Sequence, residues 1–360
     1  MIERDHLQAY TLTLTTQGPL YIGSGKKLPR KEYIFNARKK TVAFLNEQAF
    51  FDLLIQNHLV ERFESYCLRP DNELYMFLYG KCGLTEAQVR PAILYEVNVG
   101  DAMDAEHTLK DIDCFMRNVR QQAYVPGSSV KGAIRTALLF GMLQREQKTY
   151  MEFPSQGMGR GINFPETRYL HTLGLNDKPE DAVNSIMRGV QISDSQPISD
   201  GSMMLALKTD SAVDGQTHTI NLCRECVAPG TSISFQLTLD QSILKGKITK
   251  QTILDAISAF AAYQNKTYLQ HFQQPWGAMP PTGRNVLTLG GGAGFFSKSL
   301  AYPYLGEERG RAWTIEHLSR AFRAHHHEKD ETLGISPRTL KYGVYRQKLY
   351  AFGACEVTIQ

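Results

Sequence analysis

The chain has 360 residues, of which 42% are hydrophobic and 21% charged, a composition typical of a globular protein with a substantial core. The net charge of +4, from 40 Lys and Arg against 36 Asp and Glu, does not by itself indicate a nucleic-acid binder. Six scattered cysteines exclude a small disulfide-rich secreted domain. No apolar run approaches the roughly 20 residues of a membrane helix, and the segment MIERDHLQAY lacks the apolar stretch of a signal peptide. We therefore expect a cytoplasmic protein with no membrane partner.

The first part of the chain is predicted to mix short strands with helices. Alternating apolar and polar residues predict a strand at Gln8–Thr15, and Gly23–Gly25 is expected to form a flexible loop before a basic run. One apolar stripe predicts a single helix over Gln48–Tyr66. The turn at Pro126–Gly127 is followed by apolar residues at helical spacing, which predict another helix.

The second part repeats this mixture. A second sheet is expected from the strands Val190–Ser193, Met203–Lys208, Thr217–Leu222 and Ser232–Asp240. A long helix over Ile248–Phe272, a strand at Val286–Leu289 and a helix capped by Thr314 follow. Short strands around long helices favour an α+β fold over a doubly wound sheet. The length predicts two domains, which we place at residues 1–185 and 186–360.

The segment YVPGSSVKGAIRTALL (Tyr124–Leu139) predicts a binding site for an anion at a helix N-terminus. A turn precedes the helix, two serines can cap it, and a lysine and an arginine four residues apart share one side. The candidate residues are Gly127, Ser128, Ser129, Lys131 and Arg135. The segment is no Walker A loop, because the lysine precedes the second glycine. The alternative is an ordinary capped helix with exposed cations.

Two further glycine-rich segments suit close approach to a phosphate. The first opens a basic run, and the second follows an apolar strand and precedes a lysine. The candidate residues are Gly23, Gly25, Lys26 and Lys27 in the first, and Gly290, Gly291, Gly292, Gly294 and Lys298 in the second. The second is no Rossmann loop, because Phe295 stands where the last glycine would be. The alternatives are a solvated charged face and a simple turn.

Metal and nucleophile chemistry have weaker signals. Cys223 and Cys226 form a CxxC pair, and His325–His327 is the only cluster that could complete a zinc site, but the spacing matches no known finger. We expect these histidines on an exposed helix end. Asp111 and Asp113 could suggest a metal-dependent nuclease, and no Ser–His–Asp pattern is identifiable. We expect no cofactor, no metal and no catalytic residue.

The Tyr124–Leu139 segment resembles the Y-[IV]-P-G-S-S-x-K-G-A-x-R segment of the RAMP superfamily of CRISPR-associated proteins. Other segments resemble landmarks of one branch of it, in order along the whole chain. They are PLYIGSGKKLPRKEYIF (Pro19–Phe35), VQISDSQPI (Val190–Ile198), RECVAPGTSISFQL (Arg224–Leu237), LGGGAGFFSKSL (Leu289–Leu300) and the tail ISPRTLKYG with LYAFGACEV. The branch is the capping subunit of the type III-A (Csm) effector complex, at the 3′ end of the guide RNA (crRNA).

This resemblance implies two ferredoxin-like (RRM-like) halves packed together and a non-catalytic, RNA-binding subunit of an antiviral complex. The candidate glycines and cations would contact phosphate and sugar of crRNA, without reading its sequence. Expected protein partners are the repeated backbone subunit, the small subunit, and host ribonucleases recruited for maturation of the crRNA 3′ end. The alternative is a metal-independent endoribonuclease that processes CRISPR repeat RNA with a histidine near the glycine loop. The nearest histidines in sequence are His271 and His317, which argues against it.

Overall fold

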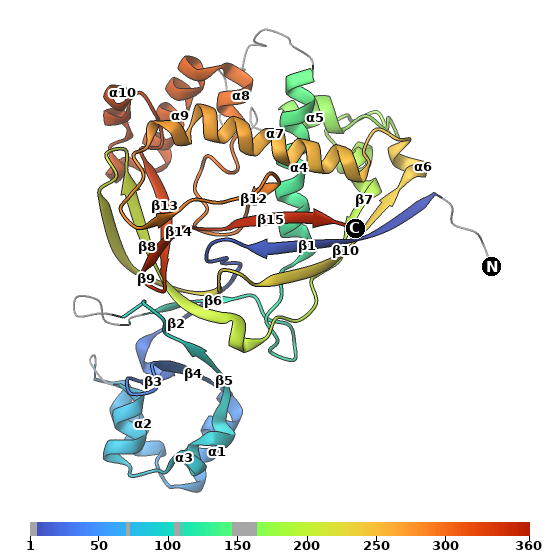
Figure 1. The fold of residues 1–360 in the computed structure, drawn as a ribbon. Coiled ribbons are helices and arrows are strands. Elements are labelled where there is room, and N and C mark those ends of the chain that lie inside the picture. The colour runs from blue at the N-terminus through green and yellow to red at the C-terminus, as the bar shows by residue number, and fades with distance from the viewer. Residues whose placement is uncertain (1–5, 70–72, 104–108, 110, 146–163) are drawn as a thin grey trace, which may run out of the picture.

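The computed structural model describes residues 6–69, 73–103, 109, 111–145 and 164–360. Within these ranges the strands form two β-sheets (Figure 1). The first, sheet A, has five strands in the order β12-β15-β1-β10-β7. Its strands are β12 (Val286–Thr288), β15 (Ala354–Ile359), β1 (Leu7–Thr16), β10 (Ser232–Asp240) and β7 (Val190–Ile192). Every neighbouring pair in sheet A is antiparallel.

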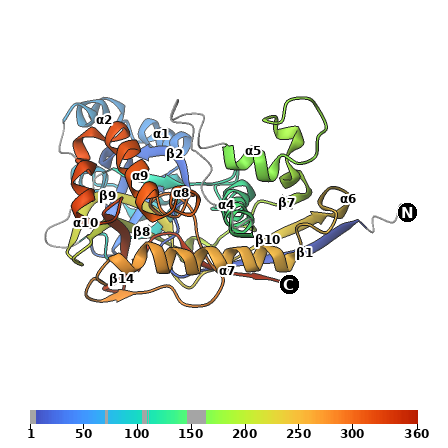
Figure 2. The same cartoon turned by 90° about the horizontal axis from the view of Figure 1, so that it is seen from above.

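Sheet A and two long helices form a ferredoxin-like unit. The helices are α4 (Gly127–Arg145) and α7 (Lys250–Thr267), which pack together over one face of the sheet (Figures 1 and 2). In chain order the elements β1, α4, β7, β10, α7 and β15 give a β-α-β-β-α-β unit, and its strands lie in the order fourth, first, third, second. The predicted α+β class with ferredoxin-like units is confirmed.

The core between sheet A and its helices follows from the sequence periodicities. Alternate residues of β1, Leu12 and Leu14, are fully buried, while Ile134 of α4 and Ile253 of α7 are buried at helical spacing. The rings of Phe140 and Phe260 join the two helices with centroids 5.1 Å apart. This packing fixes where each helix begins relative to the strand ends.

Sheet B has ten strands, with the path β11-β14-β13-β8-β5-β4-β3 and a branch in which β9 pairs with β8 and β6, and β6 pairs with β2. The strands of the path are β11 (Ala278–Met279), β14 (Lys348–Ala351), β13 (Thr339–Tyr345), β8 (Met203–Ala212), β5 (Ile93–Asn98), β4 (Thr41–Leu45) and β3 (Tyr33–Asn36). Those of the branch are β2 (Gly23–Leu28), β6 (Ile112–Phe115) and β9 (Thr217–Val227). The four strands predicted between residues 190 and 240 all form, but β7 and β10 join sheet A and β8 and β9 join sheet B.

Strands from both sides of residue 185 share each sheet, since β1 lies between β10 and β15, and β8 pairs with β5. The predicted division at residues 1–185 and 186–360 stays a prediction. None of the described helices is long and apolar enough to cross a membrane.

A small lobe is inserted in the first part of the chain, at the bottom of Figure 1. It packs α1 (Glu47–Gln56), α2 (Val60–Cys67), the π-helix η2 (Met76–Lys81) and α3 (Glu86–Val89) against β3–β5 around its own buried residues. The prediction of one helix over Gln48–Tyr66 is wrong, because the chain turns at Asn57–Leu59, where His58 has a φ of 54°. The apolar stripe continues across the break because both helices face the same core.

The remaining helices lie mostly around α4 and α7. They are α5 (Phe164–Leu170), α6 (Gln241–Leu244), α8 (Ala301–Leu305), α9 (Glu307–Ala321) and α10 (Asp330–Leu333). Short 3-10 turns lie at Arg30–Glu32, Arg90–Ala92, Ala182–Asn184, Ile186–Gly189, Asp200–Ser202, Leu269–His271, Arg323–His325 and His327–Lys329. The predicted cap Thr314 is instead buried inside α9, where its hydroxyl donates to the Gly310 carbonyl at 2.7 Å. The helix begins after Gly306, seven residues before the expected start at Thr314.

Candidate nucleic-acid interface

The strands β1, β7 and β12 run in the same direction, because β1 and β12 are both antiparallel to β15, and β1 and β7 are both antiparallel to β10. The strands β1 and β12 end at one edge of sheet A, which we call the loop edge, because both end against Ala354–Cys355 of β15. Strand β7 ends beside the middle of β1, since Ile192 and Tyr10 both pair with Leu237. The loop edge carries Pro19–Ile22 after β1 and Gly290–Gly294 after β12, while Ser193–Asp194 follow the end of β7. The helix α4 begins beside Asp194. The segment before it reaches the loop edge, because the Tyr124 N–H donates to the Met116 carbonyl and the Met116 N–H donates to the Ile22 carbonyl.

The start of α4 is held by a residue distant in sequence. The backbone N–H of Gly127 donates to Asp194 Oδ1 at 2.9 Å, so a carboxylate occupies a helix end that favours negative charge. A Cβ at Gly127 would lie 2.2 Å from the Ile192 carbonyl oxygen, so the position requires glycine. The prediction that Ser128 and Ser129 cap the helix is wrong, since both lie within its first turn and the cap is Asp194. This carboxylate also occupies part of the predicted anion site.

The two cations of α4 differ in what they contact. Arg135 Nη1 lies 3.0 Å from Glu166 Oε1 of α5, so its charge is paired. Lys131 is half-buried, and none of the described residues forms an ion pair with it. Burial and the neighbouring Arg135 lower the pKa of Lys131. An anion bound at Lys131 would offset both effects, so Lys131 is the more available of these two cations.

The segment predicted as a flexible loop at Gly23–Gly25 is the start of strand β2, which pairs with β6 through an irregular register. Only Gly25, with a φ of 83° and open space around it, has the conformation that a glycine loop requires. Lys26 lies 2.9 Å from Glu47, and Lys27 lies 3.1 Å from Asp111. The hydrogen bond from Lys26 to Glu47 raises the pKa of the lysine. Both pairs are exposed and therefore weak, so a phosphate could replace either carboxylate.

The glycine turn, residues 290–294, meets the segment before β2. Gly290, Gly292 and Gly294 have φ values of 85°, 84° and 89°, a conformation that favours glycine. The N–H of Gly291 donates to the Tyr21 carbonyl at 2.8 Å, and a Cβ at Gly290 would lie 2.5 Å from the same oxygen. The structure therefore brings the two predicted glycine segments together through Tyr21. Beyond the turn, Lys298 is exposed and forms no ion pair with the rest of the described chain.

Arg224 is a site residue that the sequence analysis did not single out. It rises from β9 beneath the glycine turn, and a Cβ at Gly292 would lie 2.4 Å from its Nη1. Its guanidinium lies 5.0 Å from the Tyr21 ring centroid, and its Nε lies 3.8 Å from Asp113 Oδ2. Nε and Nη1 are buried and have no hydrogen-bond partner among the described residues. The only available signal was its position at the start of the segment Arg224–Leu237.

The paired aspartates do not form a metal site, because Asp111 faces Lys27 and Asp113 faces Arg224. Cys223 and Cys226 pack into two different cores on opposite faces of β9, so they cannot share one ion. Burial raises the pKa of Cys223 to about 12. Among the residues that the structure describes, no three His, Cys, Asp or Glu side chains gather in a way that could hold a metal.

Two histidine predictions need correction. His325 and His326 are exposed as expected, but His327 is buried, with Nδ1 2.9 Å from Asp330 Oδ2. His317, which is distant in sequence from the glycine turn, packs near it: its ring lies 6.2 Å from the Phe295 ring and stacks on Trp313 at 5.0 Å. Sequence distance was therefore a poor reason to exclude a histidine here.

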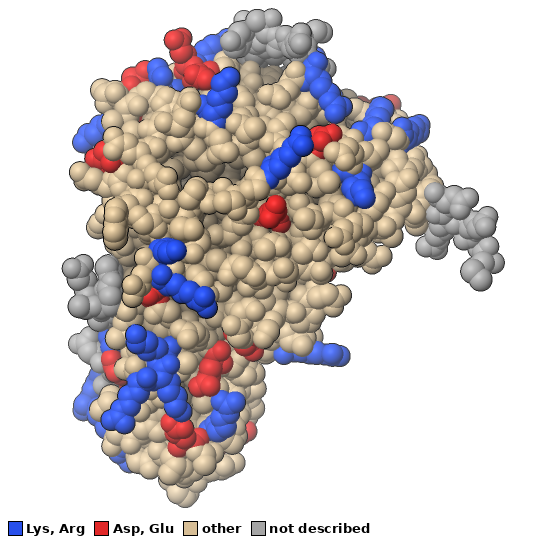
Figure 3. Space-filling model, viewed as in Figure 1, with Lys and Arg blue, Asp and Glu red and all other residues tan. Residues whose placement is uncertain are grey.

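Charge on the surface is unevenly distributed. On the face seen in Figure 3, Lys and Arg side chains gather over the small lobe and its junction with the body, interspersed with carboxylates. On the larger body the charged side chains are more widely spaced, and a hollow lies below α7. The net charge of +4 therefore hides local basic areas.

The model of the RAMP superfamily matches residues 13–297. The chain belongs to the RAMP superfamily. The match spans the loop edge, from β1 through the glycine turn. The resemblance inferred from the motifs is thereby confirmed at the level of the superfamily.

Curated relatives of this RAMP protein carry one name. The chain is 25% identical over 378 residues to the CRISPR system Cms protein Csm5 of Mycobacterium tuberculosis, covering 99% of this chain and 98% of the relative. It is also 25% identical to Csm5 of Enterococcus italicus over 393 residues, covering 100% and 99%. A Csm5 of Streptococcus thermophilus is 27% identical over 244 residues, or 65% of each chain. The similarity to the expected branch therefore extends over the whole chain.

Solved structures show the same fold. A chain of the cryo-EM structure of a Csm–crRNA–target RNA ternary complex in a type III-A CRISPR-Cas system matches with a TM-score of 0.66 at 16% identity, covering 98% of this chain and all of that chain. The crystal structure of Csm5 from T. onnurineus matches with a TM-score of 0.65 at 16% identity, covering 96% and 99%. At this identity the likeness concerns the fold of the RAMP protein alone.

Proposed function

We propose that this RAMP protein is the Csm5-type subunit of a type III-A CRISPR complex and holds the crRNA near its 3′ end. Similarity to Csm5 proteins from end to end supports this assignment. The observation that carries it is the loop edge, where the glycine turn covers the buried Arg224 and where hydrogen bonds through Met116 join Ile22 to the segment that precedes α4 and its Lys131. These cations have charge that their protein neighbours do not fully pair, which suits phosphate.

The proposed binding is electrostatic and tolerant of sequence. Lys131 and Lys298 would contact phosphates directly, while exposed Lys26 and Lys27 would exchange their carboxylate partners for phosphate. The glycine turn would admit the sugar-phosphate backbone closely, because it has no side chains. Such contacts fit a subunit that accepts any spacer. The protein would act without catalysis.

The proposed partners are crRNA, the repeated backbone subunit and the small subunit. Assistance in maturation of the crRNA 3′ end, through recruited host ribonucleases, belongs to the same proposal. Its support is the similarity to the Csm5 branch. Pull-down of the assembled complex with wild-type and loop-edge variants would show which partners depend on bound crRNA.

Crosslinking with sequencing on the purified complex tests the position on the guide. Crosslinks to peptides around Lys131 or residues 290–298, concentrated near the crRNA 3′ end, are expected. Crosslinks at the 5′ repeat-derived tag, or none to the guide, would contradict the assignment. A variant with Lys247→Ala is the matched control, because Lys247 is exposed and lies between α6 and α7, beyond the end of β10 that is opposite the loop edge.

The second candidate is a metal-independent endoribonuclease acting on CRISPR repeat RNA. The observation in its favour is the contact between His317 and Phe295, which places an imidazole beside the glycine turn. The full-length protein would be incubated with repeat RNA in the presence of EDTA. Specific cleavage that His317→Ala abolishes would establish this activity. Uncleaved RNA would contradict it and would leave RNA binding as the proposed function.

A further inference from the structure

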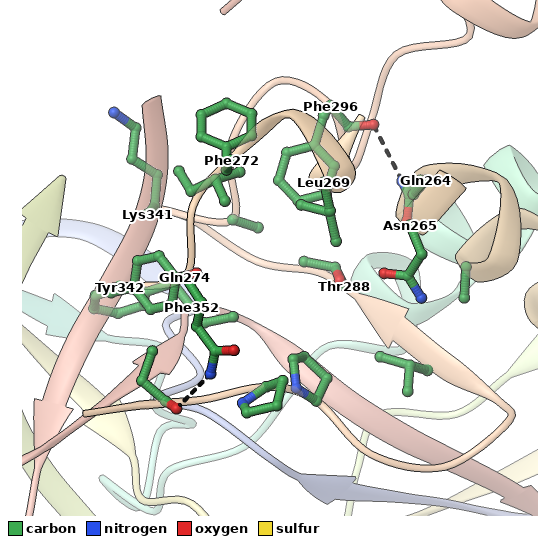
Figure 4. Close-up of a pocket in the computed structure, with 18 of the residues that line it drawn as sticks. Gln264, Asn265, Leu269, Phe272, Gln274, Thr288, Phe296, Lys341, Tyr342 and Phe352 are labelled. Carbon is green, nitrogen blue, oxygen red and sulfur yellow. Dashed lines mark hydrogen bonds between the residues drawn. The ribbon is translucent and has the colours of Figure 1, made fainter. Parts of the chain in front are cut away.

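A cavity of about 560 Å³ opens beneath α7, next to the glycine turn (Figure 4). Its walls come from α7, the segment that follows it, β12, β13 and Phe352. Ala293 of the glycine turn forms part of the wall, so the cavity adjoins the proposed RNA contact. Its volume lies within the range of roughly 300–1,000 Å³ that is usual for small-molecule sites. The cavity corresponds to the hollow below α7 in Figure 3.

The lining combines aromatic rings with amides. The rings belong to Phe272, Phe296, Tyr342 and Phe352, and the amides to Gln264, Asn265, Gln273 and Gln274. None of the lining residues is Asp or Glu. Aromatic walls with amide donors and acceptors are the chemistry by which proteins hold unstacked nucleobases.

Several polar groups in the cavity remain available to a ligand. The Gln264 amide nitrogen donates to the Phe296 carbonyl at 3.2 Å, as Figure 4 shows, which holds Phe296 and the amide on one side of the cavity. Within the described part of the chain, no hydrogen bond engages the side chains of Asn265 and Thr288, which line the same side. An amide and a hydroxyl without partners beside an aromatic ring can read the polar edge of a base.

Two cations lie at the cavity, one on an exposed side chain and one in the cavity wall. Arg284 is exposed, its Nε lies 3.3 Å from Ser258 Oγ, and no carboxylate of the described residues pairs with it. Lys341 lines the wall, but its ammonium lies 2.9 Å from Asp210 Oδ2 and is therefore paired. In Figure 4 this ammonium points away from the cavity. The unpaired positive charge thus belongs to an exposed side chain, and the interior is neutral.

We propose that this cavity takes one unpaired nucleotide of the bound RNA strand, with its base against Phe296 and its phosphate at Arg284. The proposal rests on the proposed function, because the strand reaches the cavity from the glycine turn. It adds a base-binding element to an interface that otherwise contacts backbone. A free nucleotide has the same chemistry, and the experiment separates the two sources.

The test uses the full-length protein and a labelled single-stranded oligouridylate that carries 4-thiouridine. Ala262→Trp places a large ring in the cavity from an exposed position on α7. Gln251→Trp is the matched control, because residue 251 is exposed on the same helix and lies outside the cavity. Crosslinked peptides are mapped by mass spectrometry, and affinity is measured by fluorescence anisotropy over a series of salt concentrations.

The expected result is crosslinking to peptides that contain Phe272 or Phe296, which Ala262→Trp removes. That variant should bind RNA about tenfold more weakly, with an unchanged salt dependence, because the lost contact is stacking. Arg284→Ala should reduce the salt slope by about 0.7. The control should behave as wild type.

Other results overturn the proposal in distinguishable ways. RNA that binds normally but crosslinks elsewhere, or keeps these crosslinks in Ala262→Trp, overturns the base pocket and leaves the RNA-binding function intact. Uridine monophosphate is added at the same concentration of nucleotides as the oligouridylate. If it removes the crosslinks, the cavity binds a free nucleotide instead of a strand. No RNA bound by the protein or its complex overturns the proposed function as well.

Discussion

At the scale of single residues, Lys131 and Arg135 look alike in sequence but differ in the structure. Arg135 is paired with Glu166, whereas Lys131 is half-buried without an ion-pair partner in the described ranges. We expect Lys131→Ala to reduce the slope of log affinity against log salt by about 0.7, the value for one lost phosphate contact on single-stranded RNA. Arg135→Ala should change it less, because Glu166 already offsets its charge. Anisotropy titrations compare the two, and equal losses would contradict this ranking.

The same lysine should cost the protein stability. Its pKa is lowered by burial and by Arg135, so at neutral pH the native state carries a charge that the unfolded chain holds more easily. Lys131→Met should therefore raise the free energy of unfolding, and the gain should shrink as pH rises from the lowered pKa to the ordinary lysine value of 10.5, above which Lys131 is neutral in both states. Denaturation midpoints at neutral and alkaline pH measure this. Lys266→Met, at an exposed position, should stay within about 0.5 kcal/mol.

A buried ion pair connects the segment after β6 to β9. Arg117 Nη2 lies 2.6 Å from Glu225 Oε1, with 6% and 0% of the two side chains exposed. Removing one partner leaves the other charge buried, so Glu225→Ala should cost about 3–5 kcal/mol of folding free energy. Asp200→Ala, which removes the more exposed partner of Arg117, should cost about 1 kcal/mol or less. Urea denaturation measures the loss of folding free energy in each variant. Similar losses would show that burial does not make the Arg117–Glu225 pair more costly to break than the exposed pair.

At the scale of elements, two of the three glycines of α4 have opposite roles. A Cβ at Gly127 would lie 2.2 Å from the Ile192 carbonyl oxygen, whereas nothing lies within 4 Å of one at Gly132. We expect Gly127→Ala to destabilise the protein by about 3 kcal/mol through overpacking. Gly132→Ala should stabilise it by about 1 kcal/mol, because alanine favours a helix interior. Thermal unfolding of both variants checks the pair, and a neutral Gly127→Ala would show that α4 can shift away from β7.

The start of α4 also shows how far sequence could predict this site. The turn, the glycine and the cations were predictable, because their reasons are local: chain reversal, helical spacing and charge. The cap was not, because Asp194 reaches Gly127 only through the pairing of β7 with β10. Arg224 was missed for a similar reason, since its position beneath Gly292 depends on contacts between strands distant in sequence.

Two incorrect predictions of secondary structure also arose from contacts between segments that are distant in sequence. The segment at Gly23 looked like a loop because local glycines dominate it, yet β6 supplies hydrogen bonds that make it a strand. The single helix over Gln48–Tyr66 looked continuous because one stripe serves two helices on a shared core. Periodicity reports which face is buried, and it does not report where the backbone turns.

At the scale of the whole molecule, the ferredoxin-like unit is assembled from both ends of the chain. β1 lies between β10 and β15, and α4 packs on α7. A fragment of residues 186–360 would therefore expose the edges of β10 and β15 and the apolar face of α7. A fragment of residues 1–185 would lack every strand that pairs with β1. We expect neither fragment to unfold cooperatively alone, whereas the two together should restore a cooperative transition.

Circular dichroism during urea titration measures this, first on each fragment and then on an equimolar mixture. Recovery of crRNA retention in the mixture should accompany recovery of the transition, because the loop edge needs the segment before α4 from one fragment and the glycine turn from the other. A mixture of fragments 1–185 and 186–360 in which Gly127→Ala is introduced is the control, since it keeps the chain break and impairs the junction of α4 with β7. Cooperative unfolding of residues 186–360 alone would show that this half is an independent domain, and the loop edge would then be an interface between two domains instead of one edge of a shared sheet.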